Sequence, residues 1–310
     1  MPAIYGVATN PYINGGKVRN NGVELGLSYN DHVGELNYSI NGNIAYNKNK
    51  VLEIPNSEGI IHGAQDVLFK GMQEMNRAQE GYPIGYFWGL DMAGIFQNQA
   101  EIDNYKNKDG IVIQPDAQPG DVKFVDHNGD GKIDMNDNID LGNPYPDITM
   151  GFSFSLGWKG FDFFFSSNGS FGQQVAQAYR PIDRFQYNYP KKILDRWTGE
   201  GSTNSLPRVT QGDEPNGNWL YCSQLYIEDA DFWRINNITL GYDFNRLINN
   251  SPLGKLRLYM TVQNLATITK YSGMDPEVGY TNSSSPWGSG IDLGFYPRPR
   301  TILFGLNVEF

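Results

Sequence analysis

Apolar and polar residues alternate with a period of two along much of this 310-residue chain. Between Leu36 and Tyr46 the even positions are mainly apolar, whereas the odd positions carry Asn, Ser or Ala. Successive side chains of a β-strand point to opposite faces, so this pattern predicts strands with one apolar and one polar face. Comparable runs cover residues 23–29, 84–93, 148–158, 161–170, 232–244, 255–265 and 300–310. We therefore expect an all-β fold with about eight antiparallel strands.

The length of these runs separates two architectures. Strands of soluble proteins usually have about five or six residues, whereas a tilted strand needs about nine to eleven to cross a bilayer. Most of the runs reach the longer figure. Their connections alternate between short ones, near residues 30–33, 158–161 and 249–255, and long ones, near 48–81, 97–146, 171–228 and 267–299. This arrangement is typical of an antiparallel transmembrane β-barrel with short turns at one end and long extracellular loops at the other.

A soluble β-sandwich is the alternative, because its strands also alternate between a buried and a hydrated face. The composition of the polar face favours a barrel lumen: it is rich in Gly, Ser, Asn and Thr, and it carries few Lys residues. Aromatic residues also gather near the strand ends, at Tyr29, Tyr46, Trp158 and Phe161 among others. Such belts of aromatic side chains are expected at the two membrane interfaces.

Charge and reactive side chains exclude several functions. The formal net charge is −10, whereas a nucleic-acid surface needs clustered Lys and Arg residues. Cys222 is the single cysteine and has no partner for an internal disulfide. The three histidines show no metal-binding or catalytic spacing. We therefore expect no nucleic-acid partner and no enzymatic activity.

Residues 126–137 form the one motif that predicts a metal site. The segment matches a twelve-residue calcium loop, with Gly131 at the sharp turn of position 6 and Asp137 in place of the usual Glu at position 12. Calcium takes six to eight oxygen ligands, and a plain Asn/Asp/Gly turn is the alternative without a metal. We expect a structural Ca²⁺ in an extracellular loop. Its expected ligands are Asp126, Asn128, Asp130, the Lys132 carbonyl, Asp134 and Asp137.

Several blocks of the sequence resemble a known family. The segment Gly120–Asp126 leads through the calcium-type loop to Gly142–Asp147. Further blocks follow the same order as in the family and extend over nearly the whole chain. They are residues 20–25, 81–89, 234–242, 263–265, 271–277 and 296–301. Together they resemble the SusC/RagA family of TonB-linked outer-membrane transporters.

The resemblance implies a barrel of about 22 strands around an N-terminal plug domain. With about eight strands, residues 1–310 would form the C-terminal part of such a barrel. We find no signal peptide, TonB box or plug domain in these residues, and expect them to be absent here. The final residues Gly305, Val308 and Phe310 resemble the signal that barrel-assembly machinery recognises.

The resemblance also implies a function: import of oligosaccharides or peptides across the outer membrane. The implied partners are outer-membrane lipid, a SusD-like surface lipoprotein and the TonB complex, which would act through the missing N-terminal region. Aromatic residues of the long loops are candidate ligand contacts. They are Tyr187, Tyr189, Trp219, Tyr221 and Trp287.

Two other functions remain open on the sequence alone. One is a soluble, secreted, calcium-stabilised β-sandwich that binds glycans. The other is a secreted glycan hydrolase, which would need two carboxylates at a controlled separation. No pair of acidic residues is set apart by its sequence pattern.

Overall fold

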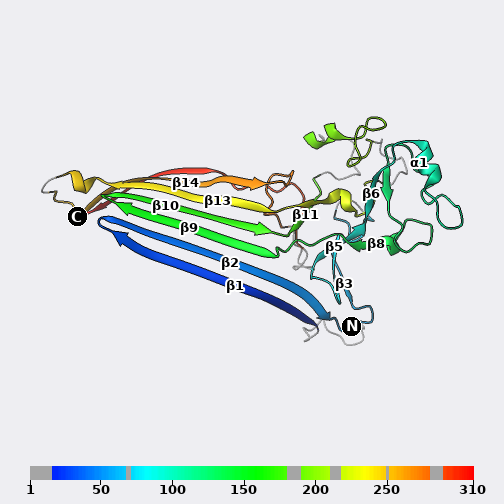
Figure 1. The fold of residues 1–310 in the computed structure, drawn as a ribbon, viewed down its shortest axis with the longest axis horizontal. Coiled ribbons are helices and arrows are strands. Elements are labelled where there is room, and N and C mark those ends of the chain that lie inside the picture. The colour runs from blue at the N-terminus through cyan, green and yellow to red at the C-terminus, as the bar shows by residue number, and fades with distance from the viewer. Residues whose placement is uncertain (1–15, 68–70, 180–189, 210–217, 249–250, 280–288) are drawn as a thin grey trace, which may run out of the picture.

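The computed structural model describes residues 16–67, 71–179, 190–209, 218–248, 251–279 and 289–310. These residues form a long sheet, here called the wall, and a group of loops and short strands at one end of it, here called the head (Figure 1). The long connections of the wall strands build the head. The short turns lie at the opposite end, as the sequence predicts.

The wall contains seven antiparallel strands in the order β1-β2-β9-β10-β13-β14-β16. Each strand pairs antiparallel with its neighbours over most of its length, and the register shifts at Ser166/Ser167 of β10 and between Ile235 and Asn237 of β13. All seven have nine residues or more and reach the length that a membrane-crossing strand needs. Their bounds are Lys17–Val33, Leu36–Glu53, Ile148–Trp158, Phe161–Phe171, Phe232–Asp243, Lys255–Thr269 and Thr301–Glu309.

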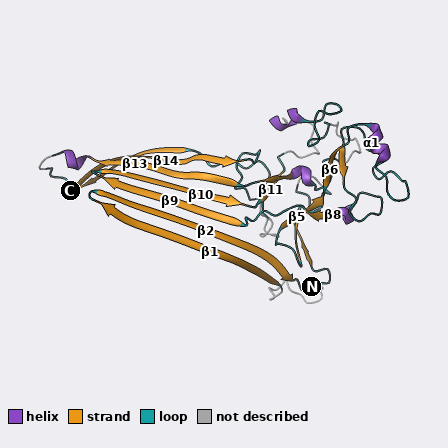
Figure 2. Cartoon of the chain, in the orientation of Figure 1, coloured by secondary structure: helices purple, strands orange, loops and turns teal. Residues whose placement is uncertain are grey.

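The head is built from short strands and helical turns (Figure 2). Its sheets have the orders β3-β4-β5-β8, β6-β7 and β12-β11-β15, and β11 and β15 pair in parallel. The head strands are β3 Ile60–His62, β4 Asn76–Gln79, β5 Tyr86–Leu90, β6 Met92–Ile95, β7 Val122–Phe124, β8 Asn138–Asp140, β11 Gln174–Gln177, β12 Ile227–Asp229 and β15 Ile291–Asp292. The helical elements are α1 Gln99–Asn104, η2 Met135–Asp137, η3 Lys191–Asp195, η4 Gln224–Tyr226 and, at the turn end of the wall, η5 Phe244–Leu247.

The two faces of the wall differ in chemistry. One face carries large apolar side chains that remain accessible, such as Leu25 at 54% and Leu258 at 49% exposure. The other face carries mainly Asn, Ser, Thr and Gly residues. Strand register brings apolar side chains mainly onto one face from strand to strand, as in the row Phe163, Leu240, Met260 and Phe304 on β10, β13, β14 and β16. The alternation predicted from sequence is therefore present in the structure.

The buried core lies in the head. One cluster gathers around Met75, Phe87 and Tyr226, and a second gathers around Leu90 and Phe124. Trp219 packs against both clusters, so it joins them into one body. Apolar burial therefore stabilises the head, whereas backbone pairing holds the wall together.

Seven of the expected strands form the wall, and the run at residues 84–93 differs from the expectation. It splits into β5 and β6 of the head. Both of its faces are covered, since Tyr86 and the adjacent Phe87 are fully buried. With five residues, β5 is also too short to cross a bilayer. Among the described residues, no helix has the length and apolar character needed to span a membrane.

The last strand contains a close contact between a glycine and an aromatic ring. Gly305 of β16 pairs with Tyr259 of β14. A Cβ atom added at Gly305 would lie 2.1 Å from Cζ of the Tyr259 ring, so the ring occupies the space that any larger residue would need. Val308 is partly exposed on the apolar face, and Phe310 is 98% exposed. The expected role of these residues as an assembly signal stays a prediction.

We expect Gly305→Val to lower the free energy of unfolding by about 1–3 kcal/mol, because the added side chain must displace the Tyr259 ring. Asn307→Val is the matched control on the same strand and face, where the side chain is exposed. Urea unfolding of the detergent-solubilised protein, followed by tryptophan fluorescence, measures both. Equal unfolding midpoints for the two variants would show that the ring contact contributes nothing.

Candidate functional site

The calcium-type loop lies in the head between β7 and β8. The Asp126 carboxylate accepts hydrogen bonds from the backbone amides of Gly129 at 2.7 Å and Gly131 at 2.9 Å. The buried Asp137 carboxylate accepts from His127 at 3.0 Å, and its other oxygen accepts from Asp134 at 2.9 Å. The two carboxylates thus hold the backbone of the loop in a closed turn.

The other expected ligands follow the same pattern. Asn128 Oδ1 accepts from the Asp130 amide at 2.8 Å, Asp130 Oδ1 accepts from the Lys132 amide at 2.9 Å, and Asp134 Oδ1 accepts from the Asn136 amide at 2.7 Å. The side-chain atoms that would bind a metal are hard oxygen ligands, which suits calcium. However, no group of three or more His, Cys, Asp or Glu side chains in the described residues is arranged to hold a metal.

Ile133 connects the loop at residues 126–137 to the apolar core of the head. Its side chain packs against the second core cluster, around Leu90 and Phe124. The apolar residue at position 8 of this loop therefore packs inward. Disorder of the loop would therefore remove a packing contact of the core of the head.

The aromatic candidates for ligand binding separate into two groups. Trp219 is a packing residue: its ring meets Tyr226 edge-on at 5.4 Å, and its carbonyl accepts the Tyr226 hydroxyl. Tyr221 is 42% exposed and meets Phe124 edge-on. Tyr187, Tyr189 and Trp287 lie outside the described residues. Ligand contact by these five residues stays a prediction.

A hollow of about 650 Å³ lies over the polar face of the wall, where the wall meets the head. Its floor follows one row of paired residues across neighbouring strands. Asn43, Gly151 and Asn168 on β2, β9 and β10 line the hollow, and the same row continues outside its lining through Arg234 and Thr267 on β13 and β14. Residues Pro276 to Gly279, in the connection after β14, also line the hollow. Single-strand patterns do not reveal this site, because its residues come from five separate segments.

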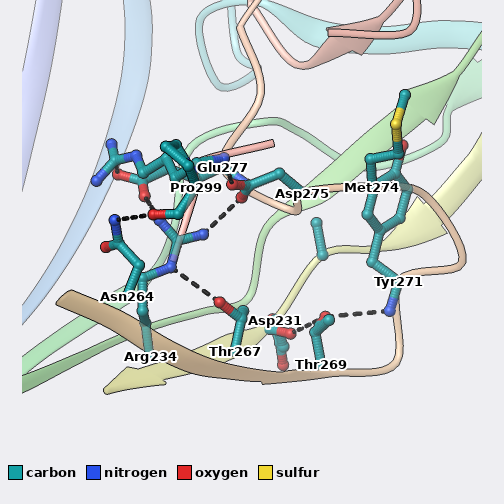
Figure 3. A network of polar contacts seen from close by, with 12 residues as sticks. Asp231, Arg234, Asn264, Thr267, Thr269, Tyr271, Met274, Asp275, Glu277 and Pro299 are labelled. Atoms are coloured by element: carbon teal, nitrogen blue, oxygen red, sulfur yellow. Dashed lines mark hydrogen bonds and ion pairs between the residues drawn. The ribbon is translucent and has the colours of Figure 1, made fainter. Parts of the chain in front are cut away.

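Arg234 holds that connection in place (Figure 3). Arg234 is only 1% exposed, and its guanidinium donates to Thr267 Oγ1 at 3.0 Å, to Glu277 Oε2 at 2.7 Å and to Asp275 Oδ1 at 2.6 Å. Arg298 pairs with the second Glu277 oxygen at 3.2 Å. One buried cation therefore joins two wall strands to the connection that covers the hollow.

Neighbouring contacts fix the start of the same connection. The Tyr271 hydroxyl donates to Asp292 Oδ2 at 2.7 Å, and the Met274 amide donates to the Tyr179 hydroxyl at 2.7 Å. Burial, followed by the hydrogen bond to Asp292, raises the pKa of Tyr271 well above its usual value. Its hydroxyl therefore stays protonated and keeps donating throughout the neutral range.

The charged groups beside the hollow are paired with each other. Asp275 and Glu277 both bind Arg234, and Glu277 also binds Arg298. A hydrolase would need one such carboxylate protonated and the other free to act as a base or nucleophile. Here both carboxylates face guanidinium groups, so the arrangement suits positioning and ligand contact better than acid–base chemistry.

Comparison with known proteins identifies relatives of the chain. No protein-family model matches it. A TonB-dependent receptor of Formosa agariphila is 30% identical over 311 residues, which cover 96% of this chain and 30% of that protein. The TonB-dependent receptor SusC of Bacteroides thetaiotaomicron is 29% identical over 95% of this chain and 27% of its own length. The chain thus spans less than a third of the curated relatives it matches.

Solved structures share the fold. The RagAB peptide transporter superposes with a TM-score of 0.71 and 22% identity, over 100% of this chain and 31% of the matched chain. The RagAB peptide importer in its closed-closed state gives a TM-score of 0.69 at 20% identity, with the same coverage. Over nearly its whole length the chain is thus similar in sequence to part of the TonB-dependent receptors, SusC among them, and its seven-stranded sheet shares the fold of part of the RagAB structures.

Proposed function

We propose that residues 1–310 are the C-terminal part of a barrel that imports oligosaccharides or peptides across the outer membrane. A SusD-like surface lipoprotein would cooperate with the head, and the TonB complex would supply energy through a plug region outside these residues. The observation that carries this proposal is the wall. Its long strands expose an apolar face suited to lipid and, opposite it, a face of Asn, Ser, Thr and Gly suited to an aqueous lumen.

The relatives support the same function. Proteins that match nearly the whole chain are named TonB-dependent receptors, and one is SusC. The structures that share the fold are those of a peptide transporter. None of these names denotes an enzyme, and the proposed role of this chain is transport without catalysis.

The apolar face also weighs against a soluble sandwich or a secreted hydrolase. In a sandwich a second sheet would cover this face. Among the described residues the remaining strands lie at the end of the wall, and the apolar face is left accessible (Figure 1). Soluble monomers rarely expose an apolar surface of this extent, whereas a bilayer would cover it.

Growth of living cells tests the proposed import. A wild-type strain, a strain without the gene and the complemented strain are compared on single neutral glycans and on peptide digests as the only carbon source. We expect the deletion to abolish growth on at least one of these sources, and the gene to restore it only when TonB is functional. Identical growth of all strains, or restoration without TonB, would contradict the proposal.

Calcium is proposed to order the loop at residues 126–137. The support is the number of oxygen donors in the loop and the absence, among the described residues, of any basic side chain paired with its four carboxylates. The carboxylates and Asn128 would hold the ion, together with the Lys132 carbonyl. Its contribution would be charge compensation and stiffening of the loop, since no nucleophile stands beside it.

We expect calcium to protect this loop from protease and a chelator to expose it. Asp126→Ala should remove the protection, because it deletes the first ligand and the acceptor of two backbone amides. Asp109→Ala is the control, an exposed carboxylate outside the loop. Timed proteolysis with mass spectrometry of the fragments measures the effect. The same cleavage rate with calcium and with chelator would refute a bound ion.

A further inference from the structure

The geometry points to the hollow over Asn43, Gly151 and Asn168 as a binding subsite for a neutral, polyhydroxylated ligand such as a short saccharide. The place of this subsite on an import path rests on the proposed transport function, whereas the binding itself does not. Of the aromatic loop residues considered from the sequence, Trp219 and Tyr221 do not line the hollow.

The floor of the hollow presents unoccupied hydrogen-bonding groups. Among the described residues, neither Asn43 nor Asn168 has a side-chain partner. Each amide offers two donors and one acceptor, which matches the paired hydroxyls of a sugar ring. Gly151 lies between them, and a Cβ atom there would approach Asn43 Oδ1 to 2.4 Å. The glycine therefore leaves room for the Asn43 side chain and for a ligand close to the wall.

The size and the cover of the hollow fit a small ligand. Its volume of about 650 Å³ lies within the range of about 300–1,000 Å³ that is usual for small-molecule sites. Residues Pro276 and Glu277, in the connection after β14, are part of its lining. Arg234 positions them through its ion pairs with Asp275 and Glu277. Arg234 is thus a positioning residue for the subsite.

The pattern of charge selects against ionic ligands. The three nitrogens of the Arg234 guanidinium are all engaged, and both Glu277 oxygens bind arginines. A peptide would bring charged termini that find no free counter-ion here. Nor could it add a strand to the floor, because strands β2, β9 and β10 each already pair with two neighbours. A neutral polyol requires neither a counter-ion nor an unpaired strand edge. Hydroxyls and amides are its usual hydrogen-bond partners.

A thiol-protection experiment tests the subsite in the full-length protein that the gene encodes, purified in detergent. Thr149 lines the hollow and is exposed, so Thr149→Cys introduces a reactive thiol there. Cys222 is buried and gives little background. The rate of maleimide labelling is measured alone and with maltotriose, cellotriose or xylotriose. The peptide trialanine and the acidic saccharide trigalacturonate serve as counter-probes.

We expect at least one neutral trisaccharide to slow labelling by about fivefold at about four times its Kd. Asn43→Leu with Asn168→Leu should abolish this protection without changing labelling in the absence of saccharide. Asn37→Leu, at the turn end of the wall, should leave protection intact. Arg234→Gln should speed labelling without saccharide, because the cover of the hollow is released. An unchanged labelling rate in the Arg234→Gln variant would refute the positioning role of Arg234.

Three outcomes would overturn the subsite. The first is no protection by any neutral trisaccharide, and the second is equal protection by trialanine or trigalacturonate. The third is a thiol that never reacts because another segment of the protein fills the hollow. Failure of transport is separable from these, because labelling in detergent needs no TonB. Cells that fail to import while the saccharide still protects the thiol would refute the proposed function and leave the subsite standing.

Discussion

Backbone hydrogen bonding between long neighbouring strands is the constraint on which the rest of this structure depends. In a bilayer no water is available to an unpaired amide or carbonyl, so each strand must bond to strands on both sides. The order β1-β2-β9-β10-β13-β14-β16 meets this condition for the five inner strands. Among the described residues, strands β1 and β16 each have one unpaired edge, and such an edge favours pairing with further strands. Once the strands are paired, their side chains can only separate into two faces.

The head obeys a different balance of forces. It lies outside the paired wall, and its stability comes from apolar clusters built by residues far apart in sequence, such as Met75, Tyr226 and Ile291. Arg234 links the wall to the head, because it lies on wall strand β13 and binds carboxylates of a connecting segment. A buried arginine of this kind is costly to desolvate unless every donor is satisfied. Here each nitrogen has a partner, and this fixes where the head closes over the wall.

The period-two pattern was enough to find the wall. Lipid on one side and a polar lumen on the other require apolar and polar residues to alternate along each strand. It could not separate residues 84–93 from wall strands, because Tyr86 and Phe87 are adjacent and both buried, and burial on both faces depends on the rest of the head. The sequence also indicated the calcium-type loop, which lies between β7 and β8.

The hollow could not be found from the sequence. Asn43 and Asn168 are unremarkable asparagines in alternating runs, and only strand register places them on either side of Gly151. Arg234 likewise falls inside a strand pattern, where a charged residue gives no sign of its partners 41 and 43 residues further along the chain. Both the hollow and the ion pairs of Arg234 depend on pairing between residues far apart in the sequence. Composition and periodicity do not reveal such pairing.

The central claim is that one face of the wall meets lipid and the other meets water. Spin labels placed one at a time along β9, from Ile148 to Trp158, measure this directly in reconstituted membranes through their accessibility to oxygen and to a water-soluble nickel complex. The account requires oxygen accessibility to peak at the even positions and nickel accessibility at the odd positions, out of phase along the strand. Accessibility without this alternation, or nickel access to both faces, would contradict it.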